Sequence, residues 1–147
     1  YELAIADLSK AIEINPKNTE AYYKRGIIYR TKGEYDLAIA DFSETIKMKP
    51  KDANMYSDRS IAYRNKREFE LAIADLTKAI ELDPGSAAAY YRRGLVYKDK
   101  RNYDSAIADF QQVALITKDP GLVRTVMEET QRLSGRGDKG AHRGEPS

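Results

Sequence analysis

Apolar and small residues recur along the chain at steps of three and four, the spacing of one face of an amphipathic helix. In the first such segment the face consists of Tyr1, Ala4, Ile5, Leu8, Ala11 and Ile12. Pro16 follows, and because proline cannot continue a helix, the helix must end before it. A different helical segment comes next, with tyrosines seven apart and a small residue between them: Tyr22, Gly26 and Tyr29. The pattern therefore predicts alternating helices of two types.

The two helix types recur with a period of 34 residues. The prolines Pro16, Pro50 and Pro84 lie at this spacing. Residues 1–16 and 69–84 are identical at twelve of sixteen aligned positions, a match that chance does not produce. A fixed period of this length is typical of helical solenoids, in which each unit buries its apolar face against its neighbours. The sequence therefore predicts a stack of helix pairs.

The tyrosine-bearing helix, here called the first-type helix, has a small residue at its centre in every copy: Gly26, Ser60 and Gly94. Glycine inside a helix costs roughly 1 kcal/mol relative to alanine, so its recurrence needs a reason. We expect that the small residue lets the following helix, the second-type helix, approach closely.

The repeated motifs resemble the tetratricopeptide repeat family. The first-type motif appears as Tyr22-x2-Arg25-Gly26-x2-Tyr29, Tyr56-x2-Arg59-Ser60-x2-Tyr63 and Tyr90-x2-Arg93-Gly94-x2-Tyr97. The second-type motif appears as Ala4-x3-Leu8, Ala38-x3-Phe42, Ala72-x3-Leu76 and Ala106-x3-Phe110. Tyrosine and arginine stand where the family usually has tryptophan and leucine. The resemblance covers residues 1–120 and implies an all-α fold, a right-handed superhelical solenoid of antiparallel helix pairs.

Six segments follow from this register. We expect a partial repeat with only a second-type helix at residues 1–18, and complete repeats at 19–52, 53–86 and 87–120. A capping helix is expected at 121–134, because Leu122, Val123, Val126 and Met127 supply one apolar face. Residues 135–147 are rich in glycine and polar residues, which predicts a flexible tail.

Composition excludes several classes of function. Lysine and arginine number 25 against 23 acidic residues, a net charge of +2, which gives little reason to expect nucleic acid as a partner. Cysteine is absent, which excludes disulfides, a thiolate nucleophile and a cysteine-ligated metal site. No apolar run is long enough to span a membrane. The chain begins inside a repeat, so we expect further sequence upstream. Localisation stays open, with the cytoplasm slightly favoured.

No residue pattern indicates catalysis, a metal site or a cofactor. The acidic residues Asp7, Asp41, Asp75 and Asp109 recur at the repeat spacing, so they form a ladder and not a convergent acid–base pair. We interpret them as solvated or salt-bridged structural charges. The single histidine, His142, lies in the predicted tail without a catalytic partner. The chain is therefore predicted not to be an enzyme.

The resemblance implies that first-type helices line a concave groove. The expected groove residues are Tyr23, Ile27 and Arg30, then Ser57, Ile61 and Arg64, then Tyr91, Arg92, Leu95 and Lys98. Apolar and aromatic contacts edged by cations suit an extended or helical peptide that carries acidic residues. The alternative for the three aliphatic residues is simple packing between neighbouring repeats.

Some family members hold the terminal carboxylate of a chaperone peptide with lysine, asparagine and arginine side chains. The matching positions here are Tyr23, Ile27, Asp58, Ala88 and Arg92. Only Arg92 agrees with that pattern, and Asp58 would repel a carboxylate. The sequence therefore predicts that the chain is not a clamp of this kind.

Three functional hypotheses remain. The first is a non-catalytic scaffold that binds a peptide or protein segment, possibly acidic, in the groove. The second is a self-associating module, a homo-oligomer driven by the apolar residues of the first helix: Leu3, Ile5, Leu8 and Ile12. The third is an RNA-binding helical repeat, which the weak net charge disfavours. The identity of the partner and the pathway cannot be read from the sequence.

Overall fold

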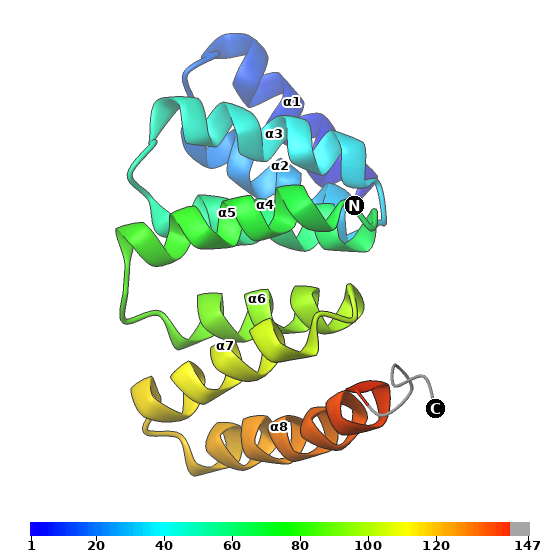
Figure 1. Ribbon diagram of the computed structural model, residues 1–147. Coiled ribbons are helices and arrows are strands. Elements are labelled where there is room, and N and C mark those ends of the chain that lie inside the picture. Colours follow the sequence, from blue (N-terminus) through cyan, green and yellow to red (C-terminus); the bar gives the residue numbers. More distant parts are fainter. Residues whose placement is uncertain (142–147) are drawn as a thin grey trace. The chain divides into compact units, whose positions relative to one another are not determined.

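The computed structural model describes the backbone of residues 1–141 and the side chains of residues 1–136. The last part of the predicted tail, residues 142–147 with His142, lies outside the described residues. Within residues 1–141 the fold has eight helices and no strand (Figure 1). The helices are α1 (Glu2–Ile14), α2 (Thr19–Thr31), α3 (Tyr35–Met48), α4 (Ala53–Asn65), α5 (Phe69–Leu82), α6 (Ala87–Asp99), α7 (Tyr103–Ile116) and α8 (Pro120–Ala141).

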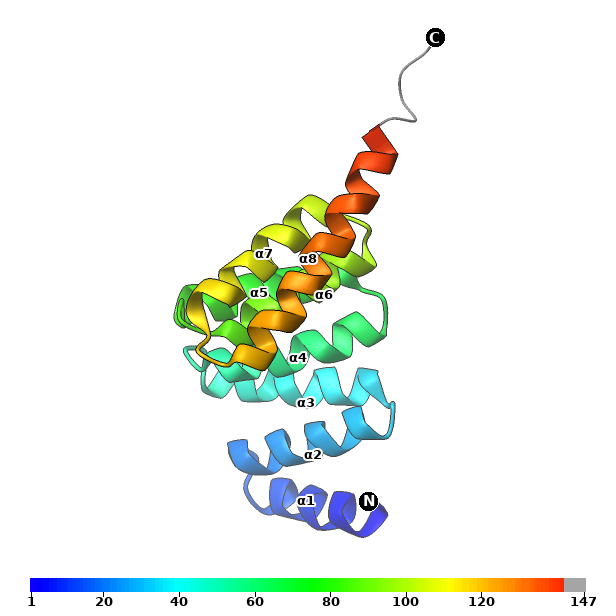
Figure 2. The same cartoon turned by 90° about the horizontal axis from the view of Figure 1, so that it is seen from below.

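The chain divides into two compact units, Tyr1–Leu82 with α1 to α5 and a second that begins at Asp83 and contains α6 to α8. In the first unit α1 packs on α2, α2 on α3, α3 on α4 and α4 on α5. Figure 2 shows α1, α2 and α3 side by side in this order. Ala38, Phe42 and Ala62 form the buried centre between α3 and α4.

Short polar motifs fix the ends of the helices. Asn18 and Ser86 each accept a hydrogen bond from a backbone N–H in the first turn of the helix that follows, as N-cap residues do. Each first-type helix is followed, two residues after its last residue, by a residue with positive φ: Gly33 at 79°, Arg67 at 62° and Arg101 at 63°. This left-handed conformation closes a helix and turns the chain into the second-type helix. Each helix pair is thus defined by local chemistry.

The glycine at the centre of α2 and the glycine at the centre of α6 each face a phenylalanine ring of the following helix. A Cβ atom built on Gly26 would lie 2.9 Å from Cε1 of Phe42, and one on Gly94 would lie 2.6 Å from Cε1 of Phe110. These distances confirm the steric reason expected for the glycines, because real Cβ atoms essentially never approach a ring carbon so closely.

In the second unit α6 packs on α7 and α7 on α8. Its core cluster contains the buried residues Ala106, Phe110, Val113, Val126 and Leu133. The helix α8 runs to Ala141, beyond the predicted end at residue 134, so the segment expected to be a flexible tail begins inside a helix. The apolar pattern located Leu133, which is buried, and not the end of the helix.

Candidate interaction surfaces

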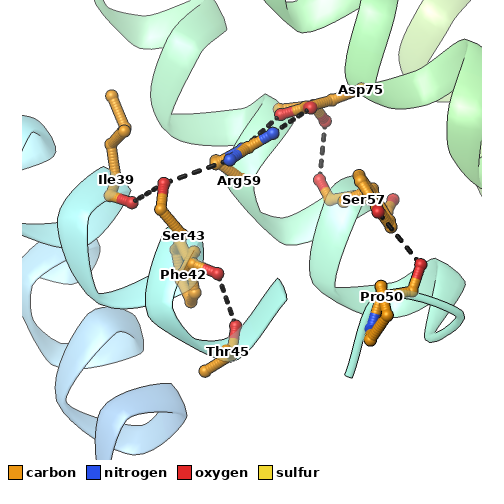
Figure 3. Close-up of polar contacts among 10 residues, drawn as sticks. Ile39, Phe42, Ser43, Thr45, Pro50, Ser57, Arg59 and Asp75 are labelled. Atoms are coloured by element: carbon orange, nitrogen blue, oxygen red, sulfur yellow. Dashed lines mark hydrogen bonds and ion pairs between the residues drawn. The ribbon is translucent and has the colours of Figure 1, made fainter. Parts of the chain in front are cut away.

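Each first-type helix holds its second-type partner through one arginine. In α2, Arg25 donates from Nε to Oδ2 of Asp41 at 2.8 Å and from Nη2 to Oδ1 at 2.8 Å. Arg59 of α4 makes the same two bonds to Asp75 of α5 (Figure 3). Arg93 of α6 repeats them with Asp109 of α7. We call this bidentate pair the Arg–Asp clamp.

The clamp also reaches the preceding second-type helix. Nη1 of Arg25 lies 3.0 Å from Oγ of Ser9 on α1, and Nη1 of Arg59 lies 3.0 Å from Oγ of Ser43 on α3. The serine hydroxyl Ser43 in turn donates to the carbonyl of Ile39 at 2.7 Å. One guanidinium therefore ties three successive helices together, as Figure 3 shows for α3, α4 and α5.

The repeated tyrosines lie beside the clamp. The guanidinium carbon of Arg25 is 5.8 Å from the ring centres of both Tyr22 and Tyr29. Tyr56 and Tyr63 flank Arg59 at 6.0 and 5.5 Å. These tyrosines are half-buried, and their rings lie against the guanidinium cation.

The interpretation of the aspartate ladder as structural is confirmed for three of its members. Asp41, Asp75 and Asp109 are buried and ion-paired. The hydrogen bonds that Arg59 donates to Asp75 raise the pKa of Arg59, which keeps that guanidinium charged at any physiological pH. In each pair the carboxylate accepts two hydrogen bonds from the guanidinium, so the aspartate is held in an ion pair and is not free for acid–base chemistry. Asp7 differs, because it is exposed on α1.

A groove of about 700 Å³ runs beside Asp7, between α1 and α2. Most of its lining is apolar, with one acidic and one basic side chain. It is lined by Ala4, Asp7, Leu8, Tyr23, Lys24, Ile27 and Ile28. Two of the predicted groove residues, Tyr23 and Ile27, thus lie in a real surface depression.

Tyr23 and Arg30 of α2 both bind Asp58 of α4. The hydroxyl of Tyr23 donates to Oδ2 of Asp58 at 2.8 Å, and Nη1 of Arg30 lies 3.4 Å from Oδ1. Burial, followed by the hydrogen bond to Asp58, raises the pKa of Tyr23 to about 12. The sequence predicts Arg30 as a cation at the edge of the groove. In the structure it is also part of a network that joins α2 to α4, which a pattern on single helices could not reveal.

The remaining predicted residues of the first unit differ in exposure. Ser57 is only 5% exposed, so it is a packing residue and offers little surface to a ligand. Ile61 and Arg64 are half-buried on α4. Ile27 packs partly against the core around Phe42, so the packing alternative accounts for part of its side chain.

The second unit places Tyr91, Arg92, Leu95 and Lys98 on α6, all half-buried. The ring of Tyr91 lies 5.9 Å from that of Phe110, and Leu95 packs against the same core. Nζ of Lys98 lies 3.1 Å from Oε2 of Glu129 on α8. As with Arg30, this predicted edge cation has an acidic partner on a neighbouring helix.

The residues predicted for self-association are unevenly exposed. Leu3 is 84% exposed, whereas Ile5, Leu8 and Ile12 are half-buried. A further apolar groove, of about 1120 Å³, lies between α7 and α8, where Leu115 is 78% exposed. The sequence analysis missed this groove, although an apolar residue near the end of a second-type helix was a usable signal.

The described residues were also compared with the requirements of a metal site and of a membrane-spanning helix. No group of three or more His, Cys, Asp or Glu side chains within the described residues is arranged to hold a metal ion. In the same part of the chain, no helix combines the length and apolar character needed to cross a membrane.

Several solved structures share this fold. The TPR2B domain of yeast Sti1 in its pHsp70 complex is 29% identical, with a TM-score of 0.74 over 80% of this chain and 97% of that one. MamA from Desulfovibrio magneticus RS-1 is 24% identical, with a TM-score of 0.76 over 79% of this chain and 66% of that one. The first TPR of Spaghetti (RPAP3), bound to the HSP90 peptide SRMEEVD, is 22% identical, with a TM-score of 0.73 over 80% of this chain and 91% of that one. The last two likenesses concern the fold alone.

Family models identify the repeats directly. Models described as tetratricopeptide repeat match residues 58–122 and 19–52, and one described as TPR repeat matches residues 1–31. No curated protein sequence matches the chain. The periodic motifs, the all-helical solenoid and these matches agree: the chain belongs to the tetratricopeptide repeat family.

Proposed function

We propose that the chain is a non-catalytic protein-interaction scaffold that binds a peptide or protein segment along its first-type helices. The observation that carries this proposal is the surface of α2 and α4 in the first unit. There Tyr23, Ile27 and Ile61 expose part of their apolar side chains beside the charged network of Arg30 and Asp58. The Sti1 domain that is 29% identical was solved in a complex with pHsp70, which supports an interaction role here.

The charges on this surface define the ligand further. Arg30 has five N–H donors, and among the described residues only Nη1 is bonded, at 3.4 Å. Arg64 adds a second guanidinium on α4. The carboxylate of Asp58 would repel a ligand with many negative charges. We therefore expect a segment with an aliphatic or aromatic anchor and one or two acidic residues, and not a polyanion.

In the second unit α6 offers the same combination, with Tyr91 and Leu95 beside Arg92 and Lys98. Lys98 is held by Glu129, which orients its ammonium group while leaving two of its three donors for a ligand. Each unit thus has its own surface of this composition.

The test is selection of short random peptides displayed on phage against the wild-type chain. Enriched peptides should carry acidic and aliphatic residues, and they should lose affinity for Arg30→Glu, Arg64→Glu and Lys98→Glu. Lys47→Glu is the matched control, because it makes the same charge change on the exposed side of α3. Circular dichroism checks that each variant stays helical. Equal binding of the selected peptides to all four variants would refute the proposed surface.

Self-association is a second candidate, favoured by the exposure of α1. This helix has no buried residue, and Leu3 is 84% exposed. Covering a leucine of this kind contributes roughly 1.5–3 kcal/mol. Sedimentation velocity over a wide concentration range should then detect oligomers that Leu3→Glu dissociates, whereas a monomer at every concentration would exclude this candidate.

A further inference from the structure

The first turns of the second-type helices in the first unit carry exposed leucines. Leu37 on α3 and Leu71 on α5 lie 34 residues apart, and each is 49% exposed. Leu37 stays exposed although α2 and α4, the helices before and after α3, both pack against α3. Its exposure is therefore a property of a complete repeat. Leu3 stands in the same register on α1.

An exposed alanine follows each of these leucines by three residues, on the same face of its helix. The small alanine leaves room beside the leucine, so that another helix can approach this face closely. We call the six exposed residues the leucine strip: Leu3, Ala6, Leu37, Ala40, Leu71 and Ala74.

Lysines from the turns join the parts of the strip into one surface. Nζ of Lys66, directly after α4, lies 2.6 Å from Oδ1 of Asp36 on α3 and 2.8 Å from Oε1 of Glu68, which directly precedes α5. Lys32 makes the same bridge between α1 and the residue before α3. Because one ammonium group reaches a carboxylate on each of two successive second-type helices, the first turns of α1, α3 and α5 are neighbours, as Figure 1 shows near the marked N-terminus.

The turns around the leucine strip have an excess of negative charge. Residues 2, 32–36 and 66–70 contain five acidic side chains against three basic ones, a net charge of −2. The side chains of Glu2 and Asp36 are 81% and 82% exposed, so each carboxylate remains accessible although a lysine bonds to it. A partner rich in lysine or arginine is attracted to such a surface, whereas nucleic acid and anionic lipid are repelled.

The second unit shows that the fold does not require leucine at this position. Ser105 stands there in α7, which forms a helix of the same length as α3 and α5. A leucine left half in water forgoes part of the free energy that its burial would contribute. Exposed leucines that gather on adjoining turns, where serine also serves the fold, are typical of a surface that contacts another molecule.

We propose that the leucine strip docks a basic amphipathic helix of a partner polypeptide. The helix sets aliphatic residues, spaced by three and four, against the leucines and alanines of the strip. Its lysine or arginine side chains flank these residues and pair with the carboxylates of the surrounding turns. The strip lies on second-type helices, whereas the peptide surface proposed above lies on first-type helices. The scaffold therefore has a second docking surface with the opposite charge preference.

The probe is a fluorescein-labelled amphipathic helix of leucine and lysine, LKKLLKKLLKKLLK, titrated with the full chain while anisotropy is recorded. Saturable binding is expected, and it should weaken as salt is added. Leu37→Ser together with Leu71→Ser should weaken binding at least about tenfold, and Asp36→Asn should weaken it about threefold. The acidic helix LEELLEELLEELLE, with the same apolar spacing, should bind far more weakly.

The second unit supplies matched controls. Leu115→Ser removes a leucine that is 78% exposed, and Asp104→Asn neutralises the exposed aspartate two repeats after Asp36. Neither change should alter the affinity. Circular dichroism checks the serine variants, which copy the residue that α7 has in this register.

Equal binding of the basic and acidic helices would overturn the proposal, and so would binding that the double serine variant leaves unchanged. Weakening by Leu115→Ser would place the probe between α7 and α8 and also overturn it. Oligomers that Leu37→Ser with Leu71→Ser dissociates in sedimentation would assign the strip to a second copy of the chain, against a partner polypeptide. Arg30→Glu separates this proposal from the peptide surface, because it should leave binding of the basic helix unchanged.

Discussion

Single residues at the centre of each helix pair are matched in size. Gly26 and Gly94 face the rings Phe42 and Phe110, whereas Ser60, which has a Cβ, is in the repeat with the smaller Leu76. Ser60 satisfies its hydroxyl within its own helix, donating to the carbonyl of Ser57 at 2.6 Å. The choice between glycine and serine in one helix therefore depends on the side chain sixteen residues later.

Substitution of Gly94 by alanine tests this match. Alanine gains about 1 kcal/mol of helix propensity. Its Cβ would, however, lie 2.6 Å from Cε1 of Phe110, and overpacking of this kind costs about 1–3 kcal/mol. Because the two effects oppose one another, we expect Gly94→Ala to lower the free energy of unfolding by up to about 2 kcal/mol in urea denaturation. In a Phe110→Leu background the same change should become neutral or stabilising; an equal loss in both backgrounds would contradict the steric account.

The network around Tyr23 predicts a distinct titration. Its pKa is raised to about 12, first by burial and then by its bond to Asp58, whereas an ordinary tyrosine titrates near 10. The folded state therefore keeps this proton when the unfolded state has lost it. The stability that Tyr23 contributes is complete below about pH 10 and is lost as the pH rises through 12.

The absorbance of tyrosinate, followed while circular dichroism confirms a folded chain, measures this titration. Tyr23→Phe should remove one late-titrating group. Asp58→Asn should lower the pKa of Tyr23 only in part, because burial is the larger cause. A late titration that persists in Tyr23→Phe would assign it to a different tyrosine.

At the scale of helices, the sequence predicted which elements form and missed how they are joined. Periodicity placed the two helix types because each must bury one face. The arginines equivalent to Arg25 and the aspartates equivalent to Asp41 were also visible in the sequence, because each set recurs every 34 residues. Their pairing was not, because it depends on how the turn at Gly33 brings α3 back along α2. The bond from Arg30 to Asp58 was missed for the same reason: it joins helices from different repeats.

The clamp gives a prediction about helix pairing. Asp75→Ala leaves the guanidinium of Arg59 without its acceptor in a site where the two side chains are only 19% and 7% exposed. Breaking a buried pair on one side costs about 3–5 kcal/mol, and partial exposure of the arginine places the expected loss near the lower value. Replacing both partners, with Arg59→Met and Asp75→Leu, should cost less than Asp75→Ala alone. Urea unfolding of the three variants tests this order, and a double variant less stable than the single one would refute it.

At the scale of the whole chain, the 34-residue period was sufficient to predict an all-α tetratricopeptide solenoid. It did not predict the division into two compact units near Leu82, because the repeat motifs continue without interruption through that point. It also did not locate the end of α8, since the segment after residue 134 has no apolar pattern although the helix continues to Ala141. Periodicity indicates which face of a helix is buried, and it carries no information on the boundary between the two units or on the last residue of α8.

The final prediction concerns which ligands the molecule rejects. Of the five positions compared with a carboxylate clamp in the sequence, Tyr23, Ile27 and Asp58 lie in the first unit, and Ala88 and Arg92 lie in the second. The three positions of the first unit therefore include an acid and no base. The acid, Asp58, is moreover fixed by its bonds to Tyr23 and Arg30, so it cannot turn away from an incoming carboxylate without breaking them.

We therefore expect the peptide SRMEEVD, bound by the Spaghetti domain, to bind this chain weakly and without using its C-terminal carboxylate. Calorimetry with the free acid and with the C-terminal amide should give the same affinity within error, because no cationic pocket distinguishes the two. Asp58→Asn provides the control: removing the acid should improve binding of the free acid more than that of the amide. Tight binding that amidation abolishes would show that a carboxylate site exists elsewhere on this surface, and that charge at these five positions does not determine ligand choice.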